Sequence, residues 1–133
     1  MGEIFGEIIR VSAGAGKYRV DGIVIVTRGG LVVCILGGER PHVGAIALAI
    51  PRQSLRDQKE LSVTSSVLTL IGHKDDEIAR PISEAIAKEL NQTTVVIAGL
   101  HINKASDQDI NKLIANSRQV SNKLITKLKE LLA

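Results

Sequence analysis

The hydrophobic pattern of the chain changes period once, and this change limits the folds available to it. Before Gly72, apolar residues come in short runs rich in valine and isoleucine, separated by glycine or proline turns, which is typical of β-strands. After Gly72 they recur at helical spacing, for example at Ile78, Ile82, Ile86 and Leu90. The sequence therefore predicts strands first and helices last, in an α+β fold.

The predicted strands are bounded by turn residues. They cover residues 2–11, 19–28, 31–37, 43–52, 61–72 and 94–99. The turn TRGG (27–30) predicts a hairpin, and Pro51 is expected to stop the fourth strand. Most neighbouring strands are joined by short turns, so we expect a mixed, largely antiparallel sheet of about six strands.

Two helices are predicted to pack on one face of this sheet. The first begins at Asp75 or Asp76, or alternatively at Arg80–Pro81 with the preceding residues as a turn. The second runs from about Asp107 to Leu132, with Ser106 and Asp109 as a capping box. At roughly 38 Å it is longer than most strands, so part of its apolar stripe is expected to face a partner or a second copy. The whole chain, 1–133, is predicted to be a single domain.

Composition narrows the possible functions. The chain has one phenylalanine (Phe5), one tyrosine (Tyr18) and no tryptophan, so the core must be aliphatic, and stacking of a base or flavin on aromatic rings is not expected. The net charge is +3 and the basic residues are spread out, which favours a solvated helix face over a nucleic-acid partner. The single cysteine, Cys34, lies in an apolar run and predicts a buried, unreactive thiol. No secretory signal or membrane-length apolar run is present, so we expect a cytoplasmic protein without membrane association.

The three histidines share one setting. His42, His73 and His101 each lie near a glycine at the end of an apolar strand, and strand ends can converge at one edge of a sheet. Such a site would also contain Arg40, Lys74, Asp75, Asp76 and Asn103. It could hold a divalent metal through imidazole and carboxylate, or a phosphate through the cations and glycine amides.

A simpler interpretation remains open for the same residues. Histidines in glycine-flanked loops are often turn residues, and Asp75 and Asp76 are explained as helix-capping acids. The histidine spacing matches no metal-binding motif, and the chain lacks GxSxG, a P-loop and GxGxxG. The residues alone therefore make no case for an enzyme.

Three segments, in chain order, resemble the prenylated-flavin chaperone-like family. They are RPHVGAIALAIPRQSL (40–55), VTSSVLTLIGHKDDEIAR (63–80) and VVIAGLHINKAS (95–106), and GHKDD is the most specific piece. Members of this family are small D subunits found alongside hydroxyarylic acid decarboxylases. The resemblance covers roughly residues 20–116. It implies a fold similar to that of the proteasome assembly chaperones, which are small α+β domains that dimerise.

The resemblance also implies a function. It points to a non-catalytic accessory protein, a homodimer that assists a prenylated-FMN-dependent decarboxylase by binding the cofactor, the catalytic subunit or both. The residues carried over from the motifs are Pro41, His42, Gly44, Gly72, His73, Lys74, Asp75, Asp76, Arg80, Gly99, His101 and Asn103. One departure is HINKAS, where Asn103–Lys104 replaces an acidic position, which lowers the expectation of a metal.

Two alternatives accompany this interpretation. One is a structural homodimeric assembly module similar to the proteasome assembly chaperones. The other is a small metal-dependent enzyme. Its candidate ligands are His42, His73, Asp75, Asp76 and His101.

Overall fold

A single six-stranded sheet forms one layer of the molecule. The computed structural model describes residues 5–70 and 75–132. The strands are β1 (Ile8–Ala13), β2 (Val20–Val26), β3 (Leu31–Gly38), β4 (Ala45–Gln53), β5 (Leu61–Thr69) and β6 (Thr94–His101), and a short 3-10 turn, η2 (Gly16–Tyr18), joins β1 to β2. Their order in the sheet is β1-β2-β3-β6-β4-β5. Only the β3–β6 pair is parallel among these strands, so the sheet is mixed and largely antiparallel, as predicted.

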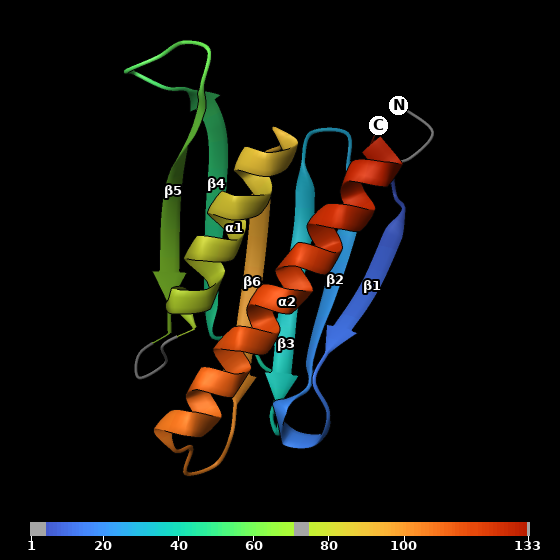
Figure 1. Cartoon of the computed structure of the whole chain (residues 1–133), viewed down its shortest axis with the longest axis vertical. Coiled ribbons are helices and arrows are strands. Elements are labelled where there is room, and N and C mark those ends of the chain that lie inside the picture. The colour runs from blue at the N-terminus through green and yellow to red at the C-terminus, as the bar shows by residue number, and fades with distance from the viewer. Residues whose placement is uncertain (1–4, 71–74, 133) are drawn as a thin grey trace.

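Both helices lie on the same face of the sheet (Figure 1). Helix α1 (Asp76–Leu90) packs on β4, β5 and β6, and helix α2 (Asp107–Leu132) crosses β1, β2 and β3 diagonally. Gly22 makes this crossing close, because a Cβ there would overlap a methyl group of Val120. The predicted two-layer α+β arrangement is confirmed, and the core is aliphatic.

The apolar stripe of α2 is mostly used within the chain itself. Leu113, Val120, Leu124 and Leu128 are buried against the sheet. Ile110 is the large apolar residue of α2 whose side chain is exposed. The length of the helix follows from its diagonal path over three strands, and does not leave a long stripe for a partner.

Several predicted boundaries were wrong. Helix α1 begins at Asp76, so the alternative start at Arg80–Pro81 is excluded and Pro81 lies inside the helix. Strand β1 begins at Ile8 and is preceded by a turn at residues 5–6. Strand β4 continues through Pro51, which is tolerated because the β6 ladder ends at Ala49 and leaves that side of β4 free.

The sheet face opposite the helices carries the other half of each strand's side chains. Cys34 belongs to this face and is only partly buried, so the prediction of a buried thiol was wrong. No helix in the described part of the chain is both long and apolar enough to cross a membrane.

Candidate ligand-binding site

The candidate site forms where the chain must cross the end of a strand. Strand β6 lies between β3 and β4, which follow one another in the sequence, so residues 39–44 have to pass over the carboxyl end of β6. We call residues 39–44 the crossing loop. The amides of Glu39 and Arg40 donate to the His101 carbonyl at 2.7 and 3.2 Å, and Gly44 N–H donates to the Ala98 carbonyl at 2.9 Å. The loop is thereby fixed along β6.

Two glycines allow this close approach. A Cβ at Gly99 would overlap the backbone carbonyl of His42, and a Cβ at Gly44 would overlap the carboxylate of Asp75. Neither position needs an unusual backbone angle, since neither residue has a positive φ. Glycine is required at both positions because of the space occupied by its neighbours.

Asp75 joins three elements of the site. Its carboxylate is buried, with only 5% of the residue exposed. The Leu100 amide donates to Oδ1 at 3.1 Å, and His42 Nε2 lies 3.2 Å from Oδ2. Asp75 occupies the N-cap position of α1, but its side chain makes no capping hydrogen bond there. The predicted N-cap position of Asp75 is confirmed, but its carboxylate reaches across to β6 and the crossing loop instead of capping α1.

Two of the three histidines converge. The rings of His42 and His101 lie 6.3 Å apart, centroid to centroid, at 83°. His42 Nδ1 lies 3.0 Å from the Arg40 carbonyl, and His101 Nε2 lies 3.1 Å from Asn103 Oδ1. Both ring nitrogens of His42 therefore face oxygen atoms of the protein itself.

The other predicted site residues lie either outside the described part of the chain or on α1. Gly72, His73 and Lys74 lie outside the described residues. Asp76 is half-buried in the first turn of α1, and Arg80 is exposed further along that helix.

Two hollows meet at His101. The first, about 360 Å³, lies between the start of α1, the end of β6 and the first turns of α2, and we call it the apolar groove. It is lined by Asp75, Glu77, Ile78, Leu100, His101, Ile102, Lys104, Ala105, Ile110, Leu113 and Ile114. The second, about 370 Å³, is lined by Arg40, Pro41, His42 and His101, and we call it the cationic hollow. Arg80 lines neither hollow.

The pair of hollows suits a ligand with two chemically different ends. The cationic hollow offers the Arg40 guanidinium beside the rings of His42 and His101, and the guanidinium favours an anionic group such as a phosphate. The apolar groove offers aliphatic walls, with the Lys104 ammonium as an additional cation. Within residues 5–70 and 75–132, no cluster of three or more histidine, cysteine or carboxylate side chains is placed to hold a metal ion.

Sequence reasoning missed two features of the site. The apolar walls, such as Ile78 and Leu113, were assigned to the core because a helical stripe does not reveal where the core ends. Glu39 was also missed, although its carboxylate accepts from the Asn103 amide at 2.9 Å and ties the crossing loop to the segment after β6. A single exposed glutamate next to a predicted loop gives no sequence signal for this contact.

The two aromatic rings are engaged outside these hollows. The Arg28 guanidinium lies over the Phe5 ring, and Lys112 over that of Tyr18. The Tyr18 hydroxyl donates to Asp109 at 2.6 Å, which raises the pKa of Tyr18 and, together with hydrogen bonds from Ser106, lowers the pKa of Asp109 to about 2.

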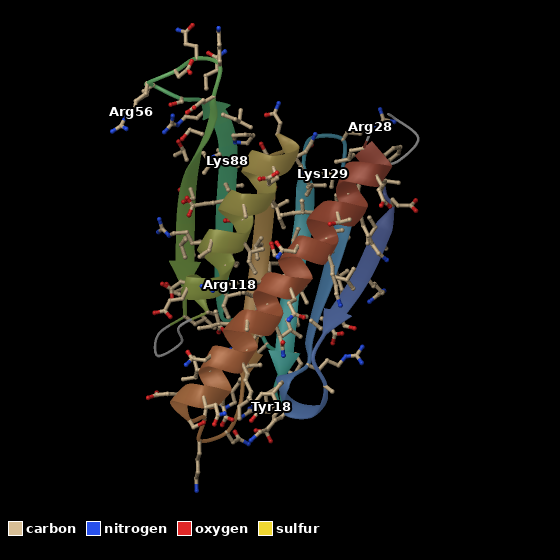
Figure 2. The ribbon with its side chains drawn as sticks, viewed as in Figure 1. Tyr18, Arg28, Arg56, Lys88, Arg118 and Lys129 are labelled. Atoms are coloured by element: carbon tan, nitrogen blue, oxygen red, sulfur yellow. The ribbon has the colours of Figure 1, made fainter. Side chains whose placement is uncertain are left out.

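Positive charge is spread over the helices and turns. Figure 2 labels cations on separate segments, namely Arg28, Arg56, Lys88, Arg118 and Lys129. They project from two turns and both helices, so this view shows no single basic face.

The sequence matches the family model of the prenylated flavin chaperone LpdD-like domain over residues 14–129. The chain belongs to this family. The match spans most of the chain and includes the crossing loop, α1, β6 and both hollows. The predicted resemblance is therefore confirmed.

A solved structure supports the fold assignment. The chain is similar to one described as a novel chaperone complex for yeast 20S proteasome assembly, with a TM-score of 0.56 and 18% sequence identity. The similarity covers 95% of this chain and 98% of the other. At this identity the likeness shows the fold alone. No curated protein matches the sequence.

Proposed function

We propose that the chain is a non-catalytic accessory protein that binds prenylated FMN or FMN, assists the catalytic subunit of a hydroxyarylic acid decarboxylase, and acts as a cytoplasmic homodimer. The observation that carries this proposal is membership of the prenylated flavin chaperone LpdD-like family over residues 14–129. The site geometry supports it, because a prenylated flavin phosphate has an anionic end and an added hydrocarbon group.

In this proposal the cationic hollow receives the phosphate. Arg40 supplies a planar fork of donors, and the rings of His42 and His101 form the walls beside it. The apolar groove receives the hydrocarbon part of the ligand against Leu100 and Ile114. Asp75 holds His42 and β6 in place through the contacts given above, so its role is to position other groups.

The test is a titration of the purified protein with FMN and with prenylated FMN, followed by flavin fluorescence, with and without Mg²⁺ or Mn²⁺. We expect saturable binding, and tighter binding of prenylated FMN by at least about tenfold, since burying each methylene contributes about 0.8 kcal/mol. Arg40→Ala should weaken both ligands by about tenfold or more, because it removes a charge-assisted contact.

Two controls separate the site from general effects. Arg52→Ala removes an equally exposed arginine from the distal end of β4, and should bind both flavins like the wild type. Ile110→Asp places a charge in the apolar groove and should reduce the preference for prenylated FMN while sparing FMN. Equal losses in Arg40→Ala and Arg52→Ala would contradict the assignment of the cationic hollow. Binding that requires the metal would instead favour the metal-dependent alternative.

A second candidate is a structural assembly module. The similarity of the fold to a proteasome assembly chaperone complex favours it. In that case neither flavin should bind, and substitution of His42 or His101 should leave binding of the protein partner unchanged.

A further inference from the structure

The sheet face that carries no helix is apolar over most of its width. Neighbouring residues on paired strands share a face, so the register defines continuous rows of side chains across the sheet. One row is Ile8–Ile25–Val32–Val95–Leu48–Ser66. The next is Arg10–Ile23–Cys34–Ile97–Ile46–Leu68. Polar residues occur only at the ends of these two rows, and we call this surface the open face.

Several large side chains of the open face are exposed. Ile8 is 54% exposed, Ile25 39% and Leu68 75%, and Ile46 and Leu48 on β4 are 38% and 36% exposed. Isolated exposed aliphatic residues are ordinary, but a continuous apolar patch across a whole sheet marks an interaction surface.

The strands themselves have the composition of strands buried on both faces. Segments GIVIV in β2, LVVCIL in β3 and VVIAGL in β6 are continuous apolar runs. Antiparallel strands that face water on one side usually alternate apolar and polar residues. Only one face of these strands is covered by α1 and α2, so the second face needs a cover.

The area of the open face is sufficient for a biological interface. Strands about 4.8 Å apart with a rise of about 3.3 Å per residue give a flat area of roughly 550 Å² for six strands of about seven residues. Two such faces bury roughly 1,100 Å² before side-chain relief is added, which exceeds the ~1,000 Å² expected of a biological interface.

We propose that the open face packs against the open face of a second copy of this chain. Its aliphatic content, without an aromatic ring in either row, is typical of homodimer interfaces, which are more apolar than the rest of a protein surface. A transient partner site is more often anchored by tryptophan, tyrosine or arginine at its centre. The two sheets would stack about 10 Å apart with the helices outside, related by a twofold axis.

This inference rests on the homodimer of the proposed function and identifies its interface. It replaces α2, whose stripe is occupied by the chain's own core. Polar residues at the margin of the open face would form a solvated rim around its apolar centre. They include Arg10 on β1, Asp21 on β2, and Thr64 and Ser66 on β5.

The experiment measures the mass of the full chain by light scattering after size exclusion. We expect the wild type at twice the chain mass of 14.2 kDa. Leu48→Glu should be monomeric, because it places a carboxylate within an apolar row of the open face. The matched control is Leu55→Glu, which changes the same residue type in the β4–β5 loop, where Leu55 is 94% exposed, and should remain dimeric.

Cys34 gives a second measurement that needs no substitution. It is the only cysteine and lies within the second row of the open face. In the dimer its alkylation should be at least about tenfold slower than in Leu48→Glu, and it should accelerate when the wild type is diluted. Circular dichroism checks the fold of each variant. If Leu48→Glu does not fold, Ile46→Lys and the dilution series take its place.

Each outcome decides between the alternatives. A wild-type dimer that persists in a folded Leu48→Glu, with Cys34 freely alkylated, overturns the inference and leaves the proposed homodimer in place. A wild type that is monomeric at every concentration overturns the inference and the homodimer, whereas flavin titration of the same sample still tests the cofactor role. Protection of Cys34 only in the presence of the decarboxylase subunit assigns the open face to that subunit and overturns the inference.

Discussion

At the scale of single residues, the shape of the site depends on two missing side chains. Gly99 lies beneath the His42 carbonyl, and Gly44 lies beneath the Asp75 carboxylate. Any side chain at Gly99 would have to displace backbone, which cannot rotate away as a flexible side chain can. The crossing loop and the position of His42 therefore depend on this glycine.

Gly99→Ala is expected to lower the free energy of unfolding by about 1–3 kcal/mol, because overpacking forces backbone shifts of this cost. Urea unfolding followed by circular dichroism measures the change. Gly29→Ala is the matched control, since a Cβ at Gly29 meets nothing within 4 Å and its φ is not positive. It should change stability by no more than about 0.5 kcal/mol. Equal effects of the two substitutions would contradict the proposed steric role of Gly99.

Sequence reasoning identified many residues of the site but not their physical roles. The motifs indicated His42, Gly44, Asp75, Gly99 and His101, and these residues do meet around the crossing loop. Asp75 occupies the predicted N-cap position, but the contacts of its carboxylate were not predicted, because an aspartate before a helix already has a local explanation as a cap. Its actual contacts are with a strand 25 residues further along the chain, and local patterns do not encode them.

At the scale of elements, the start of α2 is the best example of a local pattern that holds. The predicted capping box is confirmed, with Asp109 N–H donating to Ser106 Oγ at 3.0 Å and Ser106 N–H donating to Asp109 Oδ2 at 3.1 Å. Tyr18 adds a tertiary hydrogen bond to the same carboxylate, which ties η2 to α2. These bonds favour the ionised form and lower the pKa of Asp109 to about 2, from an ordinary value of 3.8.

This shift makes a prediction about pH. A carboxyl group whose pKa is lower in the folded state stabilises the fold above its unfolded pKa, and loses that contribution as the pH falls through the folded pKa. The stability that Asp109 contributes should therefore be complete above pH 3.8 and decline toward pH 2. Asp109→Asn keeps the shape but removes the charge. The wild type should exceed it in free energy of unfolding near neutral pH, with the difference shrinking between those limits.

Asp107→Asn provides the control for this experiment. Asp107 is in the same first turn of α2, so its carboxylate acts on the same helix terminus. Urea unfolding of the three proteins across the acid range distinguishes the two positions. A loss of equal size and pH profile in Asp107→Asn would show that the effect comes from the helix dipole and not from the Tyr18 and Ser106 hydrogen bonds.

Pro51 and Pro81 show why the boundaries of helices and strands were harder to predict than their existence. Pro51 was expected to end β4, since proline cannot donate a ladder hydrogen bond. Whether that loss matters depends on the neighbouring strand, and β6 no longer pairs with β4 at that point. Pro81 likewise lies within α1, where its position gave two possible helix starts. Strand neighbours and helix starts of this kind are set by tertiary structure, and a local pattern does not contain them.

At the scale of the whole molecule, the insertion of β6 between β3 and β4 shapes both of the surfaces to which we assign a function. It forces the crossing loop over the end of β6, and it completes the apolar rows of the open face. The number of strands and the side occupied by the helices followed from periodicity. The strand order did not, because any of these apolar runs could have paired with β3. The continuous apolar runs already indicated that the second face of the sheet is apolar, whereas sequence reasoning assigned the partner surface to α2.

A dimer joined by the open face should have a melting temperature that depends on protein concentration, because association and folding are linked. A tenfold dilution changes the free energy of such a linked equilibrium by about 1.4 kcal/mol. For an assembly of this size, that corresponds to a decrease in Tm of about 2–4 °C. Leu48→Glu should melt lower than the wild type and show no dependence on concentration, whereas Leu55→Glu should follow the wild type. Calorimetry over a hundredfold range of protein concentration, which corresponds to two tenfold dilutions, measures this dependence. A wild-type Tm that stays constant over that range would mean that the open face is not covered by a second copy in the folded protein.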